Sequence, residues 1–445
     1  MFGRSVRHGM FGRGGWFAVC SAGGTVCSAG GTVCSAGGTV CSAGGLSRIL
    51  IVRILYLSQR VPYPPNRGDK ITTWRNVDYL RRNHDVTCVA FAHDEGDLKA
   101  ARDLRDMGIK IETVDLDMKA QKLRSLPMLF TRKPLTLGVY GSRKLQAVVD
   151  RLMPGIDLAI AYSSSMGAFI LPHKHKKRIQ YVVELDSDKW AQYEGFTKPP
   201  MKWVYGREAR TLRRFEQVLC SEMDMNVLVT PLEQRIFQEA VPGAPSLVMR
   251  NGVDLDLFNP GANAPEPGHL VFTGVMDYFP NTDGCDWFAR EILPAVQAEV
   301  PGAHFSIVGS APTDAVRALG ELPGVTVTGF VDETRDWLAR ADLAVAPLRI
   351  ARGIQNKVLE AMAMGLPVVG TTHATQGVDG KSNRDYVVAD TKEAQIQSVV
   401  RLLRDRKEAL ALGKRARTFV EEKYRWEDVL APLGELISSL EKTSK

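Results

Sequence analysis

Two residues of opposite charge stand three positions apart in the stretch RGIQNKVLEAMAMGLPVVGTT, Arg352 to Thr372. They are Lys357 and Glu360, and residues three apart lie on the same face of a helix. Gly353 precedes the expected helix N-terminus, so the backbone amides and Lys357 can bind a diphosphate. Glu360, one turn later, can accept hydrogen bonds from a ribose diol. The alternative is a solvated ion pair worth less than about 1 kcal/mol, which the flanking apolar segments disfavour.

Two further loops place glycines between an apolar strand and the start of a helix. In SQRVPYPPNRGDK, Gly68 allows backbone amides to approach an anionic ligand at the helix N-terminus. The alternative for that loop is a tight turn stiffened by its three prolines. The second loop, GVMDYFPNTDG, runs from Gly274 to Gly284 and has the same order of strand, loop and helix. Both are candidate binding loops.

The elements that must position these loops alternate along the chain from residue 52 onward. Strands rich in Val, Ile and Leu that are separated by helices predict parallel sheets covered on both faces. The expected strands are VRILYLSQR, DVTCVAFA, DLAIAYSSS and RIQYVVELD in the first half, and HLVFTGV, HFSIVGS, VTVTGF, LAVAPL and PVVGT in the second.

The predicted fold class is therefore α/β, with two doubly wound, Rossmann-like domains facing each other across a cleft. A segment dense in Gly, Pro, Asn and Ala, residues 249–269, marks the boundary. We expect an N-terminal domain over 52–250, a linker over 251–268, a C-terminal domain over 269–420 and a helical segment over 421–445. Open α/β sheets bind ligands at the carboxyl ends of their strands, so the cleft is the default site.

Length and composition limit the class of protein. At 445 residues the chain is too long for one ordinary domain, and its apolar fraction of 44% can fill real cores. The net charge is +7, but four of the 57 basic residues fall in the first 51 positions, where no acid occurs. The remaining 53 basic and 50 acidic residues nearly balance, which argues against a dedicated nucleic-acid binder.

The first 51 residues contain a tandem repeat, CSAGGTV, which places four of the seven cysteines seven positions apart. Such a repeat can neither fill a helical seam nor build a core, so this tail is predicted to be disordered, and translation to begin near Val52. A lipoprotein signal ending at Cys20 is disfavoured by the short apolar run before it. A cysteine-based metal tract stays open as an alternative.

The other three cysteines, Cys88, Cys220 and Cys285, follow no metal or redox spacing. They are expected to be buried free thiols in a reducing compartment. No apolar run reaches the length of a membrane span. Together these features predict a cytoplasmic protein.

Several short motifs together resemble a known family. TGVMDYFPNTDG, SIVGSAP, GFVDE, LAVAPLR, NKVLEAMAMGLPVV and NGVDLDLF are similar to motifs of the retaining nucleotide-sugar glycosyltransferases of family 4, which have the GT-B fold. The N-terminal ILYLSQRVPYPPNRGDKITTW and ELDSDKW resemble more closely the sugar transferases associated with PEP-CTERM exopolysaccharide clusters. The resemblance covers nearly everything after residue 52.

That resemblance implies roles for particular residues. The C-terminal domain would hold the nucleotide-sugar donor, with Glu360 at the ribose and Lys357 by the diphosphate. The N-terminal domain would close over the sugar through Gly68 and present the acceptor. The other implied donor-binding residues are Gly274, Asn281, Gly353, Phe330 and Val331, the last two lining the base.

The sequence departs from the family pattern at two places. Arg352 stands where family members usually carry a second Glu, eight residues before Glu360, and Pro280 and Asn281 replace a frequent Arg-Lys pair. Arg352 cannot accept a hydrogen bond from a sugar hydroxyl. We expect Arg352 and Lys357 to act catalytically by stabilising the leaving diphosphate without a metal. The departing phosphate would take the acceptor proton.

Asp186 and Asp188 form an Asp-x-Asp tripeptide that follows a strand late in the first domain. Such a pair can clamp Mn²⁺ or Mg²⁺ together with a diphosphate. Because the donor motifs lie in the second domain, we favour an acceptor-side role for both residues, with Asp188 taking part in catalysis. A helix N-cap by either residue is the remaining alternative.

The helix expected over MKWVYGREARTLRRFEQVL has an apolar side and several arginines elsewhere. With the basic run HKHKKR it could rest on an anionic membrane beside a lipid-linked acceptor. An ordinary amphipathic helix packed on the core is the favoured alternative.

The sequence thus predicts a metal-independent hexosyltransferase that moves a sugar with retention from a nucleotide-sugar to a glycan or polyprenyl-linked acceptor, in exopolysaccharide biosynthesis. No cofactor and no nucleic-acid partner are expected, and peripheral contact with the inner face of the cell membrane is a further expectation. The alternatives are a sugar-nucleotide 2-epimerase of the same fold and a catalytically silent nucleotide-sugar sensor.

Overall fold

The computed structural model describes residues 51–261 and 265–442, and within the first 50 residues it gives five short strands. These are β1 (Phe17–Cys20), β2 (Thr25–Ser28), β3 (Ser35–Ala36), β4 (Thr39–Ser42) and β5 (Gly45–Ser47). The rest of the tail lies outside the described residues, and its predicted disorder stays a prediction.

The first domain is built on a parallel sheet of seven strands, in the order β8-β7-β6-β9-β10-β11-β12. The strands are β6 (Arg53–Ser58), β7 (Asp85–Ala92), β8 (Lys110–Asp115), β9 (Leu158–Tyr162), β10 (Lys177–Val183), β11 (Met225–Leu228) and β12 (Ser246–Val248). The helices are α1 (Gly68–Arg81), α2 (Glu95–Asp106), α3 (Met118–Ser125), η1 (Leu126–Phe130), α4 (Leu135–Tyr140), α5 (Arg143–Leu152), η2 (Met153–Gly155), α6 (Ser164–Ile170), α7 (Asp186–Phe196), α8 (Met201–Ser221) and α9 (Pro231–Ala240).

Strand β6 shows why this sheet is covered on both faces. Successive side chains of a strand point to opposite faces. Ile54 and Tyr56 are buried in one apolar cluster, whereas Leu55 and Leu57 are buried in another. A strand whose successive central side chains are all apolar therefore needs packing elements on both sides.

The second domain is built on a parallel sheet of six strands, in the order β15-β14-β13-β16-β17-β18. Its strands are β13 (His269–Thr273), β14 (His304–Val308), β15 (Val325–Gly329), β16 (Leu343–Ala346), β17 (Val368–Gly370) and β18 (Val387–Val388). The helices are α10 (Phe279–Trp287), η3 (Phe288–Ile292), α11 (Leu293–Glu299), α12 (Asp314–Leu319), α13 (Thr334–Arg340), α14 (Asn356–Ala363), α15 (Thr372–Thr375), α16 (Lys392–Arg404) and α17 (Arg406–Lys423). The predicted pair of doubly wound domains is confirmed.

Helix α10 begins at Phe279, ahead of the predicted helical segment that opens at Gly284. Pro280 stands in its first turn, where a missing N–H costs nothing and the fixed φ of proline suits a helix. As a result, Asn281 lies on the first turn of a helix and not in a loop.

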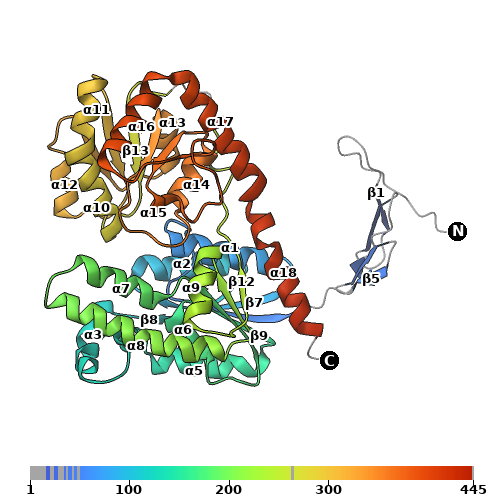
Figure 1. Cartoon of the computed structure of the whole chain (residues 1–445). Helices are drawn as coiled ribbons and strands as arrows, with labels where there is room; N and C mark the ends of the chain where they lie inside the picture. Colours follow the sequence, from blue (N-terminus) through green and yellow to red (C-terminus); the bar gives the residue numbers. More distant parts are fainter. Residues whose placement is uncertain are drawn as a thin grey trace.

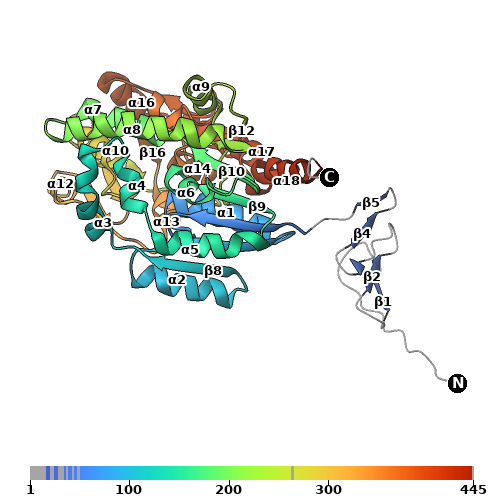
Figure 2. The ribbon, with the colours of Figure 1, turned by 90° about the horizontal axis from the view of Figure 1, so that it is seen from below.

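Helix α18 (Trp426–Lys442) returns the chain from the second domain to the first (Figures 1 and 2). Trp426 and Leu433 are buried in the same apolar cluster as Ile54 of β6. Just before this helix, the backbone N–H of Val253 in the linker donates to Tyr424 O at 2.8 Å. The chain therefore crosses between the domains at two adjacent points.

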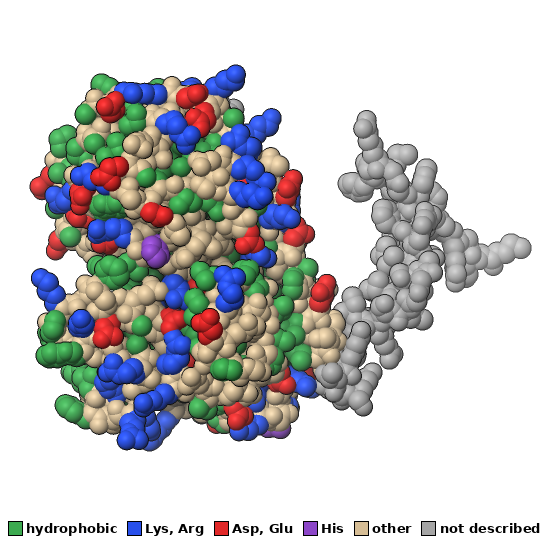
Figure 3. Space-filling model, viewed as in Figure 1, with side chains coloured by type: hydrophobic (Ala, Val, Ile, Leu, Met, Phe, Trp, Pro, Cys, Tyr) green, Lys and Arg blue, Asp and Glu red, His purple; other side chains and the backbone are tan. Residues whose placement is uncertain are grey.

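The strand order reverses at the first strand of each sheet, β6 and β13. Ligands of open α/β sheets bind beyond the carboxyl ends of the strands at such a point. The loop that follows β6 meets the other domain, because a Cβ atom placed on Gly68 would lie 3.9 Å from Asn356 Nδ2 at the start of α14. In the space-filling view, the outline of the molecule is indented on the left between the two lobes (Figure 3).

Candidate active site

Three helices that start near this junction, α1, α10 and α14, have N-termini without side-chain caps. Their N-cap residues, Arg67, Tyr278 and Gln355, make no capping hydrogen bond through their side chains. The amides in the first turn of such a helix can bind an anion. Gly353, just before α14, has φ +62°, a left-handed backbone that favours glycine.

Lys357 lies in the first turn of α14. In the described part of the chain, no carboxylate lies within 4.0 Å of its ammonium group. Its Nζ donates to Asn281 Oδ1 at 2.7 Å and lies 4.6 Å from the ring centroid of Phe272. Gly274 makes room for this contact, since a Cβ atom there would lie 2.7 Å from Asn281 Nδ2 and 3.4 Å from Lys357 Cε. Burial lowers the pKa of Lys357 to about 8.

Glu360 lies one turn further along α14 and is only partly accessible to solvent. Within residues 51–261 and 265–440, its carboxylate has no hydrogen bond and no ion pair within 4.0 Å. Burial raises the pKa of Glu360 to about 7, against the opposing charge of Lys357. The alternative of a solvated Lys357–Glu360 ion pair is therefore wrong, because the two groups do not come within 4.0 Å of each other and both are partly buried.

Arg352 makes the strongest contact between the two domains near this site. Its guanidinium donates to both carboxylate oxygens of Glu233 on α9, at 2.8 and 2.6 Å, and its Nη1 lies 3.5 Å from Asp188 Oδ2 on α7. Burial alone would lower the pKa of Arg352, but the hydrogen bonds and charge of Glu233 hold that pKa above its ordinary value. The charge of Arg352 is thus shared with carboxylates of the N-terminal domain.

The Asp-x-Asp tripeptide lies at the start of α7, and both carboxylates are bound by basic side chains. Asp186 accepts from Lys189 Nζ at 2.8 Å, and Asp188 pairs with Arg213 as well as with Arg352. The N-cap of α7 is Leu185, which makes no side-chain hydrogen bond. The N-cap alternative for Asp186 or Asp188 is therefore wrong.

Two acidic residues that the sequence analysis did not identify, Glu184 and Glu233, also take part in this contact between the domains. Glu184 lies between β10 and α7, and its Oε2 would be 3.4 Å from a Cβ atom placed on Gly353. Burial raises the pKa of Glu184 to about 7, and the charge of Glu233 acts in the same direction. Glu184 opens the motif ELDSDKW and could have been found there. Glu233 follows Thr230 in the T-x-x-E pattern of a helix start, which carries no functional signal.

Phe330 and Val331 follow the edge strand β15, away from the residues that contact Lys357. Phe330 is 70% exposed, while Val331 packs against the core of the C-terminal domain. Among the described residues, no aromatic or polar contact of the Phe330 ring is recorded, so its face remains open to a planar ligand.

Comparison with solved structures agrees with this architecture. Sucrose-phosphate synthase from Thermosynechococcus elongatus superposes with a TM-score of 0.68 at 16% identity, over 88% of this chain and 100% of that one. HepE from Anabaena, solved in complex with UDP-glucose, superposes with a TM-score of 0.64 at 15% identity, over 87% of this chain and 100% of that one. The fold is GT-B.

Sequence comparison locates the relationship in the C-terminal domain. Residues 267–405 match the family model described as glycosyl transferases group 1. A GDP-mannose-dependent alpha-(1-6)-phosphatidylinositol monomannoside mannosyltransferase of Mycobacterium tuberculosis is 31% identical over 160 residues, which is 33% of this chain and 42% of that protein. The segment that matches this family model includes Lys357 and Glu360. The match spans less than half of the mannosyltransferase.

Proposed function

We propose that this protein is a glycosyltransferase that takes its sugar from a nucleotide-sugar donor. The observation that carries the proposal is the pair Lys357 and Glu360, both partly buried and without an opposite charge within 4.0 Å in the described part of the chain. Both lie on a helix with an uncapped N-terminus, inside the domain that matches the glycosyl transferases. A buried charge without a partner raises the free energy of the site until a ligand supplies one.

The donor would lie along α14. Its diphosphate would accept from the first-turn amides and from Lys357, and its ribose would donate to Glu360 one turn later. Phe330 offers a ring face for the base. HepE is solved with UDP-glucose and the mycobacterial relative depends on GDP-mannose, and a nucleoside diphosphate is common to both donors.

Transfer then requires that the bond between the anomeric carbon and the diphosphate oxygen breaks. Negative charge develops on the leaving diphosphate, and donors fixed in place around it stabilise this charge. Lys357 and the amides of α14 can do this through their own N–H groups. We expect the acceptor hydroxyl to add on the face that the leaving group vacates, with retention, and to lose its proton to the departing phosphate.

Arg352 takes a different role in this proposal from the one its position first implied. Its guanidinium is bound by Glu233 and Asp188, so little of its charge remains for a diphosphate. We infer that Arg352 positions the two domains and is not a catalytic group. On the side of the N-terminal domain, Gly68 would close over the donor sugar, and Asp186 would face the acceptor.

A surface at one end of the N-terminal domain fits an acceptor that is anchored in a membrane. Phe130 is 93% exposed, Trp203 70% and Leu123 69%. Arg207 of α8 donates to Leu129 O at 2.9 Å and so holds η1 against α8. Exposed basic residues on and beside these segments include Lys122, Arg124, Arg132, Lys133, Lys198 and Lys202. Figure 3 shows apolar and basic side chains at the left end of the lower lobe.

This apolar and basic surface supports peripheral contact with an anionic membrane, and through it a polyprenyl-linked acceptor. The inner side of α8 packs on the core as predicted, since Leu212 and Leu219 are buried. None of the helices in residues 51–261 and 265–442 combines the length and apolar character of a membrane span. The exopolysaccharide acceptor rests on the resemblance of the N-terminal motifs alone.

The proposal is tested first with nucleotides. Thermal unfolding in the presence of UDP, GDP, ADP and TDP should show one base that raises Tm most, because a ligand stabilises the fold that binds it. Incubation with the matching nucleotide-sugars should then release free sugar and nucleoside diphosphate slowly. Conversion of one donor into its epimer would indicate a 2-epimerase instead, and binding with neither reaction would indicate a sensor.

The membrane contact is tested by sedimentation with phosphatidylcholine vesicles that contain or lack phosphatidylglycerol. The wild-type protein should pellet with the anionic vesicles only, and the double variant Phe130→Ser, Trp203→Ser should stay in solution. Leu410→Ser removes an apolar side chain that is 58% exposed on the other domain and serves as the control. Equal sedimentation of all three proteins would rule out this surface.

A further inference from the structure

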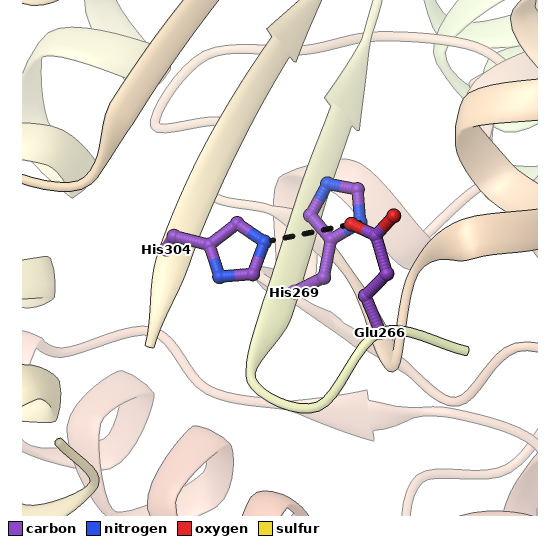
Figure 4. A group of neighbouring side chains, drawn as sticks. All are labelled: Glu266, His269 and His304. Atoms are coloured by element: carbon purple, nitrogen blue, oxygen red, sulfur yellow. Dashed lines mark ion pairs between the residues drawn. The ribbon is translucent and has the colours of Figure 1, made fainter. Parts of the chain in front are cut away.

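Glu266, His269 and His304 form a cluster at the amino ends of β13 and β14 (Figure 4). His269 and His304 are the first residues of these parallel strands and are partners in the sheet register. Gly274 follows β13 at its other end. The cluster is therefore separated from the site around α14 by the length of the strands.

One ligating atom of each residue turns toward the others. Glu266 Oε2 lies 3.6 Å from His269 Nδ1 and 3.9 Å from His304 Nε2, and all three atoms lie within 4.8 Å of one another. Zn²⁺ holds nitrogen and oxygen ligands at about 2.0–2.2 Å, so two tetrahedral ligands are separated by roughly 3.3–3.6 Å. Small side-chain movements would bring the three atoms to that spacing.

Neighbouring groups orient His304 and Glu266 for such a role. His304 Nδ1 lies 3.1 Å from the carbonyl oxygen of Gly302, which can only accept, so Nδ1 carries the proton and Nε2 presents its lone pair. Glu266 Oε1 accepts from Arg340 Nε at 2.8 Å, which leaves Oε2 free. Metal-binding side chains are typically held in this way by hydrogen bonds to their outer atoms.

His269 is buried, with 1% of its side chain exposed, and both ring nitrogens have neighbours. Nδ1 lies 3.2 Å from Arg340 O, and Nε2 lies 2.8 Å from Ser306 Oγ. The Ser306 hydroxyl can donate or accept. The Arg340 carbonyl oxygen can only accept, so without a metal Nδ1 carries the ring proton and Ser306 donates to Nε2. Metal binding would move the ring proton to Nε2, where Ser306 can accept it, and Nδ1 would exchange its bond to Arg340 O for the metal.

We propose that Glu266, His269 and His304 bind one divalent transition-metal ion of the zinc type. Two imidazole nitrogens and one carboxylate oxygen are a donor set of Zn²⁺, and water would supply the fourth ligand. The two imidazole rings are now stacked, with centroids 4.7 Å apart and 11° between their planes. Since a metal binds in the plane of the ring, His304 has to turn and to adjust its bond to Gly302 O, and its side chain is 36% exposed.

The bound ion would join the segment before β13 to the first residues of two core strands. It would stabilise the C-terminal domain and take no part in sugar transfer. The prediction that transfer needs no metal concerns the site around α14. It is independent of the metal site proposed at Glu266, His269 and His304. Transfer is therefore expected to survive treatment with EDTA, while Tm falls if the metal was bound.

The test has to exclude the four cysteines of the tail, which can also bind Zn²⁺. We would titrate the full chain carrying Cys20→Ser, Cys27→Ser, Cys34→Ser and Cys41→Ser with Zn²⁺ by calorimetry, and with Co²⁺ by X-ray absorption. His304→Ala and Glu266→Gln are the test variants in that background. His175→Ala, which removes an exposed histidine from the other domain, is the control.

We expect one Zn²⁺ per chain, nitrogen and oxygen ligands only, and a rise in Tm on binding. His304→Ala should weaken binding by tenfold or more, as expected when a ligand is removed, while His175→Ala leaves it unchanged. Donor hydrolysis should be the same in all variants, so failure of this proposal is distinguishable from failure of the proposed activity. Absence of binding in the cysteine-free background, or equal affinity after His304→Ala, would overturn it.

Discussion

Lys357 and Arg352 are two cations five positions apart in the same segment, yet the fold treats them in opposite ways. Lys357 has a neutral amide, Asn281, as its polar partner. Arg352 has two carboxylates, Glu233 and Asp188, both from the other domain.

The difference shows that one cation of a site can stay available to a ligand while a neighbouring cation is neutralised by carboxylates and stabilises the fold. A charge that a carboxylate already neutralises gains little from a phosphate, whereas a partly buried charge without an anion gains a great deal. In the proposed function, Lys357 therefore takes part in the chemistry, and Arg352 stabilises the contact between domains. For Lys357 this assignment agrees with the expectation from the sequence, whereas for Arg352 it differs, since Arg352 occupies the position of an expected active-site residue.

The largest effect is expected from Arg352→Glu. The new carboxylate would face Glu233 and Asp188, and Glu233 would lose its bidentate partner. Breaking a buried pair by removing one member costs about 3–5 kcal/mol, and we expect a loss of unfolding free energy on that scale by chemical denaturation. The matched control is Arg349→Glu, which breaks a pair with Asp283 inside one domain where the arginine is 46% exposed.

The control variant should lose less than about 1 kcal/mol, as exposed pairs do. If Arg352→Glu were as stable as the wild type, the structural role of Arg352 would be refuted. Unchanged stability together with abolished transfer would return Arg352 to the catalytic group.

The second effect is expected from Lys357→Met, which keeps the length of the side chain and removes its charge. If Lys357 stabilises the leaving diphosphate, kcat should fall by about 10²–10³, the scale seen when one such donor is removed. The Kd of the nucleotide should change much less, because the charge matters chiefly as the bond breaks. Equal losses in kcat and in affinity would show that Lys357 only binds the donor.

Glu360→Ala should weaken donor binding by about 1–3 kcal/mol, the scale for a charge-assisted hydrogen bond. Because the carboxylate has no partner among residues 51–261 and 265–440, its removal should leave the free energy of unfolding unchanged or higher. Calorimetry with the nucleotide and denaturation without it measure the two effects separately. Glu321→Ala, on the exposed surface of the same domain, is the control and should alter neither.

The smallest effect is a pH dependence of at most about tenfold around neutrality. Donor binding needs Glu360 ionised and Lys357 charged. Their pKa values of about 7 and about 8 place the best binding between these two values. Affinity for a nucleotide-sugar should fall as the pH drops below 7 and also as it rises above 8. Glu360→Gln should remove the fall in affinity below pH 7, and Lys357→Met should remove the fall in affinity above pH 8.

Without donor, the free energy of unfolding should depend on the same two groups, but it should be lowest where donor affinity is highest. The pKa of Glu360 is raised from 4.5, so its contribution to stability is present below pH 4.5 and is lost as the pH rises through about 7. The pKa of Lys357 is lowered from 10.5, so its contribution is present above pH 10.5 and is lost as the pH falls through about 8. Both contributions are absent between 7 and 8, where the donor should stabilise the protein most.

The sequence by itself determined the class of fold. Apolar residues at successive positions of β6, β9 and β13 require cover on both faces of each sheet, and that requirement is local to each strand. In the two large sheets, the strands β8, β11, β12 and β18 were not predicted. β8 lies at a sheet edge and has only two buried residues, and β11, β12 and β18 have only four, three and two residues, so their patterns are too weak or too short to identify.

The sequence also predicted candidate binding loops, because a glycine before a helix start has the same local meaning wherever the helix lies. Gly353, Lys357 and Glu360 were proposed as site residues from this segment of the sequence. Only the tertiary structure decided the partners. Arg352 and Glu233 are 119 residues apart, and no periodicity connects them. They meet because two separately folded sheets place the carboxyl ends of their strands at one junction, and the packing of that junction decides which charges are neutralised and which stay available to a ligand.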